Sequence, residues 1–200
     1  MNNQEINKTQ GKKVNTMHSL KMKIFLLVFI AIIFAIVLCL LMIVPKSKSN
    51  LEMVIENYMK DITVVEGENL DRDLAREGAD TVLSAEALQD DLKGISISGM
   101  PSSYAYIFSG TDGTMLYHPT ADKIGLPVEN AAAKQLLTEI GEGKKPEPSV
   151  IEYEFKGKQK YAAYYIGNEA AFVLIITADG DEVFASLNET TNYSLIGALI

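Results

Sequence analysis

The chain has 200 residues, a formal net charge of −8 and a hydrophobic content of 48%, with a single cysteine. One cysteine excludes a disulfide within the chain. The negative charge argues against nucleic acid as a partner, because the phosphate backbone is recognised by clustered cations. The hydrophobic content is unevenly distributed, so one segment has to be considered apart from the rest.

Residues 24–44 form an apolar segment without a single charged side chain. At 1.5 Å per residue a helix of this length spans roughly 31 Å, the thickness of a bilayer core. The alternative is a cleaved signal peptide, but its apolar region would be shorter and a small-residue cleavage pattern would follow. We therefore predict a transmembrane helix over residues 24–44, preceded by a tail of residues 1–23.

Lysines are concentrated before the predicted span. Four lie between residues 12 and 23, whereas only Lys46 and Lys48 follow closely. Because positive charge is retained on the cytoplasmic side, residues 1–23 are predicted to be cytoplasmic and residues 46–190 to form an extracytoplasmic domain at the cell membrane. Cys39 lies inside the span, so this domain has no thiolate metal site and must be stabilised by burial of its core.

A long helix is predicted over about residues 50–92, where apolar residues recur at helical spacing. Gly67 and Gly78 weaken the pattern locally, and a break containing Gly99 and Pro101 ends it. Such a stripe is normally a core or a seam between helices. The helix directly follows the membrane span, so a change in its packing is transmitted to the bilayer.

The rest of the domain, a core of about residues 102–180, has the periodicity of strands. Asp112-Gly113 and Lys156-Gly157 are hairpin turns, and the unbroken apolar run at 171–177 is typical of a central strand covered on both faces. The sequence predicts an α+β domain with an antiparallel sheet of about five strands packed with helices. The expected strands are 104–109, 114–117, 150–155, 158–166 and 171–177, and the expected helices 128–140 and 181–192.

Residues 193–200 (YSLIGALI) are apolar again and are interpreted as the start of a second transmembrane helix. The alternative is a hydrophobic tail that packs on the domain. With two membrane helices, the domain is a loop between them.

Catalytic residue patterns are scarce in the predicted domain. His118 is its one histidine, and no serine has a G-x-S-x-G setting, which argues against nucleophilic catalysis. The acidic residues from Asp71 to Asp80 lack the spacing of an EF-hand and are interpreted as a solvated helix face. We predict no enzymatic activity, no cofactor and no metal.

Polar aromatic residues and a few charges near strand ends suggest a pocket for a small polar metabolite. Lys160 would neutralise a ligand carboxylate, His118 or a tyrosine would donate a second hydrogen bond, and Asp179 would hold an ammonium group. The alternatives are sheet packing for the tyrosines, a solvent-facing Lys160 and a helix cap at Asp179. The group comprises Tyr104, Tyr106, Tyr117, His118, Lys160, Tyr161, Tyr164, Tyr165 and Asp179.

Three stretches resemble the extracytoplasmic Cache sensor domain of bacterial methyl-accepting chemotaxis proteins. They are SSYAYIFSGTDGTMLYHPTADKIGLPVEN (102–130), IEYEFKGKQKYAAYYI (151–166) and FVLIITADGDEV (172–183). The most specific parts are the Y-x-Y strand, D-G-T-M-L-Y-H-P, K-I-G-x-P-V-x-N and K-Y-A-A-Y.

The resemblance implies a PAS-like antiparallel sheet on a long N-terminal helix that often pairs in a homodimer, with a ligand held between the sheet and the loops on its far side. Family members sense amino acids, small carboxylates and other metabolites. The arginine-and-tryptophan amino-acid pattern of many two-module relatives is missing, so amino acids are not favoured over carboxylates, and the length fits a single-Cache receptor. By position, the pocket would draw on Tyr104, Tyr106, Tyr117, His118, Lys160, Tyr164 and Asp179.

The resemblance further implies a transducer that controls chemotaxis, with its methylation sites and its contacts to the cytoplasmic kinase and adaptor in residues beyond 200. The same sensor module attached to a histidine kinase or a cyclic-dinucleotide enzyme is one alternative. A membrane-anchored binding or structural protein without signalling output is another.

Overall fold

The computed structural model describes residues 20–185, and the chain divides into two compact units, Met1–Lys46 and Ser47–Ile200. Helix α1, Leu20–Glu77, contributes residues to both units. In the first unit its apolar side chains are exposed, and its most apolar window has a mean hydropathy of 3.6. Within residues 20–185 it is the one helix long and apolar enough to cross a membrane, and it contains the predicted span.

The single long helix predicted over about residues 50–92 is divided into three helices in the structure. Helix α1 ends at Glu77, and α2 (Ala79–Val82) and α3 (Ala85–Leu92) follow. Gly78 separates α1 from α2 with a φ of +84°, a conformation that side-chain-bearing residues rarely adopt. Ser84 caps α3 by accepting a hydrogen bond from the backbone N–H of Ala87. The predicted weakening at Gly78 is therefore a break, whereas the helix continues through Gly67.

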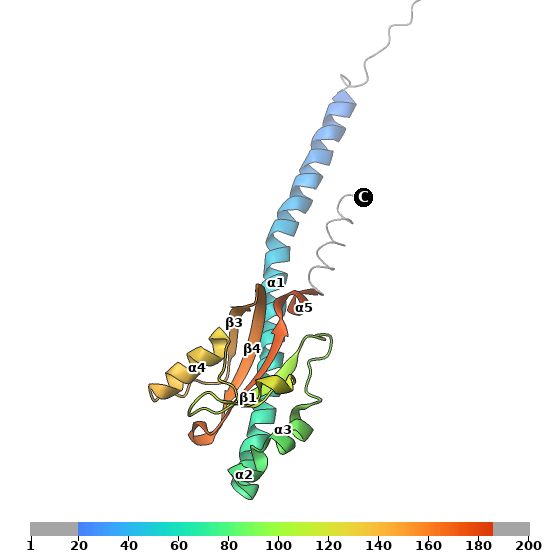
Figure 1. The fold of residues 1–200 in the computed structure, drawn as a ribbon. Coiled ribbons are helices and arrows are strands. Elements are labelled where there is room, and N and C mark those ends of the chain that lie inside the picture. Colours follow the sequence, from blue (N-terminus) through green and yellow to red (C-terminus); the bar gives the residue numbers. More distant parts are fainter. Residues whose placement is uncertain (1–19, 186–200) are drawn as a thin grey trace, which may run out of the picture. The chain divides into compact units, whose positions relative to one another are not determined.

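Five antiparallel strands form one sheet in the order β2-β1-β5-β4-β3. This order and the long N-terminal helix give the predicted α+β, PAS-like architecture (Figure 1). The hairpin turn between β3 and β4 uses positive φ angles at Lys156 and Gly157, as the sequence predicts. The strands are β1 (Tyr104–Phe108), β2 (Met115–Tyr117), β3 (Val150–Phe155), β4 (Lys158–Ile166) and β5 (Val173–Asp179).

Strand β5 lies at the centre of the sheet, and every residue in it is buried. Its side chains alternate between two cores, as the period of a strand requires. Leu174 and Ile176 face α1, α2 and α3, and this side is called the helix face. Val173 and Ile175 face α4 (Ala131–Gly141), and this side is called the pocket face. Each fully buried isoleucine contributes about 1.5–3 kcal/mol to the free energy of unfolding.

Some predicted boundaries were wrong. The helix predicted over 128–140 begins at Ala131, because the side chain of Asn130 accepts the Ala133 N–H and caps the helix. The strand predicted over 171–177 is displaced, because a short 3-10 helix, Asn168–Ala170, precedes β5. Helix α5, Gly180–Val183, occupies the start of the segment predicted as helix over 181–192. Residues 186–192 of that segment and residues 193–200 lie outside the described residues.

Candidate functional site

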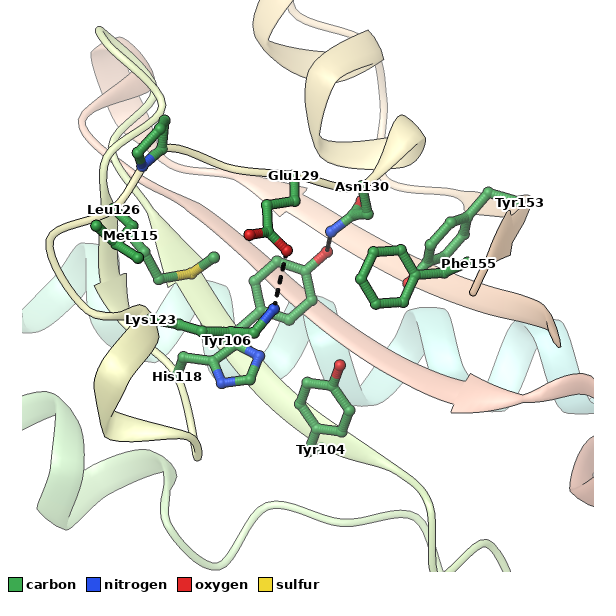
Figure 2. Close-up of a pocket in the computed structure, with 11 residues that line it drawn as sticks. Tyr104, Tyr106, Met115, His118, Lys123, Leu126, Glu129, Asn130, Tyr153 and Phe155 are labelled. Carbon is green, nitrogen blue, oxygen red and sulfur yellow. Dashed lines mark hydrogen bonds and ion pairs between the residues drawn. The ribbon is translucent and has the colours of Figure 1, made fainter. Parts of the chain in front are cut away.

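A pocket opens on the pocket face of the sheet, between β1, β3 and the loop of residues 118–130 (Figure 2). Three of the predicted site residues line it: Tyr104, Tyr106 and His118. Because successive strand residues alternate, Tyr104 and Tyr106 project from the same face of β1. The other lining residues are Met115, Lys123, Leu126, Pro127, Glu129, Asn130, Tyr153 and Phe155.

The loop is held against β2 by backbone hydrogen bonds. The N–H of Met115 donates to the carbonyl of Leu126, and the N–H of Gly125 donates to the carbonyl of Met115, each at 2.8 Å. Gly125 has a φ of +82°, which favours glycine at this turn. A short 3-10 helix, Ala121–Lys123, precedes the turn and places Lys123 at the pocket.

His118 is held as a neutral hydrogen-bond donor. Its Nδ1 accepts the backbone N–H of Thr120 at 2.9 Å, so in the neutral ring the proton is on Nε2. Burial, with a smaller contribution from the charge of Lys123, lowers the pKa of His118 to about 4. The ring packs edge-on against Tyr104, with centroids 5.3 Å apart. At neutral pH the imidazole is therefore an uncharged donor with a fixed tautomer.

The hydroxyl group of Tyr106 is the second hydrogen-bond donor of the pocket, and Asn130 determines that its hydrogen is free. The Asn130 Oδ1 accepts the Ala133 N–H at 2.9 Å as the cap of α4, so its Nδ2 is the group that donates to the Tyr106 hydroxyl oxygen at 2.9 Å. The hydroxyl hydrogen of Tyr106 thus remains to be donated to another group. Burial raises the pKa of Tyr106 well above its usual value, which keeps the phenol protonated.

Lys123 and Glu129 form an ion pair in the lining of the pocket (Figure 2). The Lys123 Nζ lies 3.2 Å from the Glu129 Oε2 and 5.6 Å from the centroid of the Phe155 ring. The Lys123 side chain is 30% exposed and that of Glu129 60% exposed. A pair this open is worth only about 0–1 kcal/mol, so its partners can be exchanged at little cost.

Tyr153 provides an acceptor on the β3 side of the pocket. The Thr177 hydroxyl donates its single hydrogen to the carbonyl of Tyr161 at 2.9 Å. The hydrogen bond of 3.3 Å between the hydroxyls of Tyr153 and Thr177 is therefore donated by Tyr153, whose oxygen can still accept. Burial raises the pKa of Tyr153.

The free volume of the pocket is about 20 Å³, enough for one water molecule. A metabolite is several times larger, so it has to displace side chains of the wall. The exchangeable Lys123–Glu129 pair and the half-buried ring of Tyr104 are the parts of the wall that can move at least cost.

The predicted residues Lys160 and Asp179 pair with each other. The Lys160 Nζ donates to the Asp179 Oδ1 at 2.5 Å, and Lys158 donates to the other carboxylate oxygen at 2.7 Å. Burial opposes the Asp179 charge, but both lysines outweigh it, so the pKa of that carboxyl is lowered. The Lys160 Nζ lies 5.6 Å from the centroid of the Tyr104 ring. Lys160 is thus next to the wall of the pocket and does not line it.

Four further residues of the predicted group lie away from the pocket. Tyr117 on β2 lies opposite Ile107 on β1, and both side chains belong to the core of the helix face. Tyr164 is on the pocket face, but its hydroxyl donates to the carbonyl of Glu147 at 2.8 Å. Tyr161 and Tyr165 bind α1 instead, through Glu52 at 3.2 Å and Asp71 at 2.8 Å. Glu52, which accepts the hydrogen bond from Tyr161, also lies close to two other acidic residues.

Those three carboxylates, of Glu52, Glu56 and Glu152, have oxygen atoms within 4.8 Å of one another. Burial raises the pKa of Glu56, and the charges of Glu52 and Glu152 raise it further. The amide of Gln159 donates to Glu152 at 2.7 Å, and Tyr161 donates to Glu52. The carboxylates are thus partly satisfied by the protein itself, and the expected absence of a metal site stays a prediction.

Solved structures similar to the chain include ligand-binding domains of chemoreceptors and extracellular domains of histidine kinases. The ligand-binding domain of Mlp24 with asparagine matches at 14% identity and a TM-score of 0.37, covering 52% of this chain and 38% of that one. The extracellular domain of the histidine kinase mmHK1S-Z3 matches at 19% identity and a TM-score of 0.42, with 52% and 39% covered. The domain of the Pseudomonas aeruginosa PAO1 amino acid chemoreceptor PctB with L-arginine matches at 19% and 0.33, with 50% and 39% covered.

The matched region spans about two-fifths of the length of those structures. No family model and no curated protein matches the chain. With TM-scores below 0.5, these superpositions carry no functional assignment.

Proposed function

We propose that this chain is the sensor region of a transmembrane receptor and that its pocket binds a small metabolite through a carboxylate group. The observation that carries the proposal is the convergence of three hydrogen-bond donors on one pocket. They are the ammonium group of Lys123, the neutral imidazole of His118 and the hydroxyl of Tyr106. We propose that the pocket binds its ligand without catalysing a reaction.

The charge around the pocket favours an anion. Residues 45–200 carry 13 lysines and arginines against 25 aspartates and glutamates. Around the pocket, however, the ammonium groups of Lys123 and Lys156 both lie over the ring of Phe155, and that of Lys160 lies over Tyr104. These lysines offset the negative charge of the domain near the pocket, which weakens the repulsion of an anionic ligand.

Glu129 supports an amino acid as the second candidate ligand. When the carboxylate of a ligand pairs with Lys123, the carboxylate of Glu129 loses its partner. An ammonium group on the same ligand would replace Lys123 as that partner. Since Glu129 is 60% exposed, water can also satisfy it, and a carboxylate without an ammonium group remains the first candidate.

A homodimer through α1 is proposed from an exposed stripe on that helix. Val54, Tyr58 and Val65 are exposed by 61%, 48% and 55%, and with Asp61 they recur at intervals of four, three and four residues. At 3.6 residues per turn these positions share one face, opposite the side that packs on the sheet through Met59. Such a spacing is typical of a seam between two helices.

Signalling across the membrane is proposed from the continuity of α1. The same helix holds the predicted span and packs against the sheet, so a ligand that favours one packing acts directly on the membrane helix. The coupling equals the difference in ligand affinity between the two packings. Control of chemotaxis through parts beyond residue 200 is the proposed output. Alternatives are a histidine kinase or cyclic-dinucleotide enzyme output, or a membrane-anchored binding protein without output.

A thermal melting screen of the 200-residue chain in lipid nanodiscs tests the proposal. The compounds are acetate, succinate, glycine and L-alanine, each at about 10 mM, because ligand that binds the native state raises its stability. At least one of the four is expected to raise the melting temperature of the domain. If none does, binding of a small carboxylate or amino acid is contradicted.

A further inference from the structure

Four residues join the wall of the pocket to α5, the last described element. Strand β1 begins at Tyr104, β5 ends at Asp179, and the register of β4 places Lys160 opposite Asp179. The pocket wall and the start of α5 are therefore neighbours at one end of the sheet. Ser102, two residues before Tyr104, completes the connection.

Ser102 contacts both the end of β5 and α5 itself. Its Oγ accepts the backbone N–H of Asp179 at 2.9 Å and donates to the Glu182 Oε2 at 2.6 Å. The backbone N–H of Ser102 donates to the same Glu182 oxygen at 2.9 Å. One carboxylate on α5 is thus fixed by two hydrogen bonds from the residue that leads into β1.

On the pocket side, Tyr104 is coupled to Lys160. The Lys160 side chain is buried, and its ammonium group neighbours both the Asp179 carboxylate and the Tyr104 ring. The Tyr104 ring also packs on His118 and forms part of the pocket wall. Any ligand that displaces this ring changes the surroundings of a buried charge whose partner directly precedes α5.

We propose that Ser102 is a positioning residue that passes a displacement of the Tyr104 ring to α5, together with the Lys160–Asp179 pair. Helix α5 directly follows β5, which ends at Asp179. The inference rests on the proposed sensor function for its biological meaning. The test below uses no ligand, so its failure is distinguishable from the failure of the ligand screen.

The test is a double-mutant cycle read by hydrogen exchange of the backbone amides of residues 180–185, on the 200-residue chain in nanodiscs. Tyr104→Leu removes the ring, and Ser102→Ala removes the hydroxyl group that contacts Asp179 and Glu182. Phe155→Leu is the matched control, because it makes the same kind of change at another part of the pocket wall.

Tyr104→Leu is expected to speed exchange in residues 180–185 by at least about threefold when Ser102 is present, and by less than about 1.5-fold when Ser102 is alanine. Phe155→Leu should leave this exchange unchanged. Should Tyr104→Leu fail to fold, Lys160→Met replaces it with the same expected pattern. An equal effect of the ring or lysine substitution in both backgrounds, or no effect, overturns the proposal.

Discussion

The hydroxyl group of Tyr165 on β4 donates a hydrogen bond of 2.8 Å to the Oδ2 of Asp71 on α1. The Oδ1 of the same carboxylate accepts the backbone N–H of Asn168 at 3.0 Å. Asp71 is only 8% exposed, so the accepting carboxylate is shielded from water. This carboxylate therefore fixes the long helix to the sheet and to the turn between β4 and β5.

Asp71→Ala should lower the free energy of unfolding by about 1–3 kcal/mol, because it removes two hydrogen bonds between the long helix and the sheet region and leaves both donors without this acceptor. Asp73→Ala is the control, since Asp73 forms an exposed pair with Arg76 and should change the stability by about 1 kcal/mol or less. Urea unfolding followed by the near-ultraviolet circular dichroism of the tyrosines measures both. Equal losses for the two variants would refute the role of Asp71.

Gly67→Ala tests the packing of α1 on β4. A Cβ at Gly67 would overlap the ring of Tyr165, so the ring or the helix has to shift, at a cost of about 1–3 kcal/mol. Gly141→Ala on α4 is the control, because a Cβ there meets no atom within 4 Å. The melting temperature should fall for Gly67→Ala and stay level or rise for Gly141→Ala. Unchanged melting of Gly67→Ala would show that the helix packs differently.

Most of the fold follows from periodicity and turn residues. The bounds of β3 and β4 are those expected, because alternating side chains and the Lys156-Gly157 turn act locally. The displacement of β5 was not predictable in this way, because the residues before it form a 3-10 helix with positive φ angles at Glu169 and Ala170. Neither residue type indicates such a conformation in the sequence.

The site was less predictable, because it depends on contacts between distant segments. Tyr104, Tyr106 and His118 were found from their strand positions, and alternation along β3 already placed Tyr153 and Phe155 on one face. Lys123 and Glu129 lie in a loop, where no periodicity indicates orientation. Lys160 and Asp179 were predicted as ligand contacts, but the β4–β5 register makes them partners, which the sequence alone does not determine.

His118 should make the stability of the domain depend on pH. Its folded pKa of about 4 is below the unfolded value of about 6.5, so the unfolded chain binds more protons between these values. The contribution of His118 is complete above about pH 6.5 and declines as the pH falls towards 4. His118→Asn, whose Oδ1 can still accept the Thr120 N–H, should be less sensitive to pH in this window. Unfolding free energies at several pH values measure the difference, and identical pH profiles would contradict it.

The α1 stripe predicts a specific cross-link between two copies of the chain. In a Cys39→Ser background, Val65→Cys should form an intermolecular disulfide on mild oxidation, because equivalent seam residues face each other in a helix pair. Lys134→Cys, at an exposed position on α4, is the control and should remain monomeric on a non-reducing gel. Equal cross-linking at both positions would indicate random collision and refute the proposed seam.

The most direct test of the proposed carboxylate site is thermal melting of the wild type, Lys123→Met and Lys144→Met with acetate, succinate, glycine and L-alanine. Methionine is an unbranched side chain only one atom shorter than lysine, and it removes the charge. Lys144 is 65% exposed, lies outside the pocket and is the matched control. At least one compound is expected to stabilise the wild type and Lys144→Met alike, whereas Lys123→Met should bind that compound about tenfold more weakly or worse and lose most of the shift. A full ligand-induced shift in Lys123→Met would contradict the proposed site.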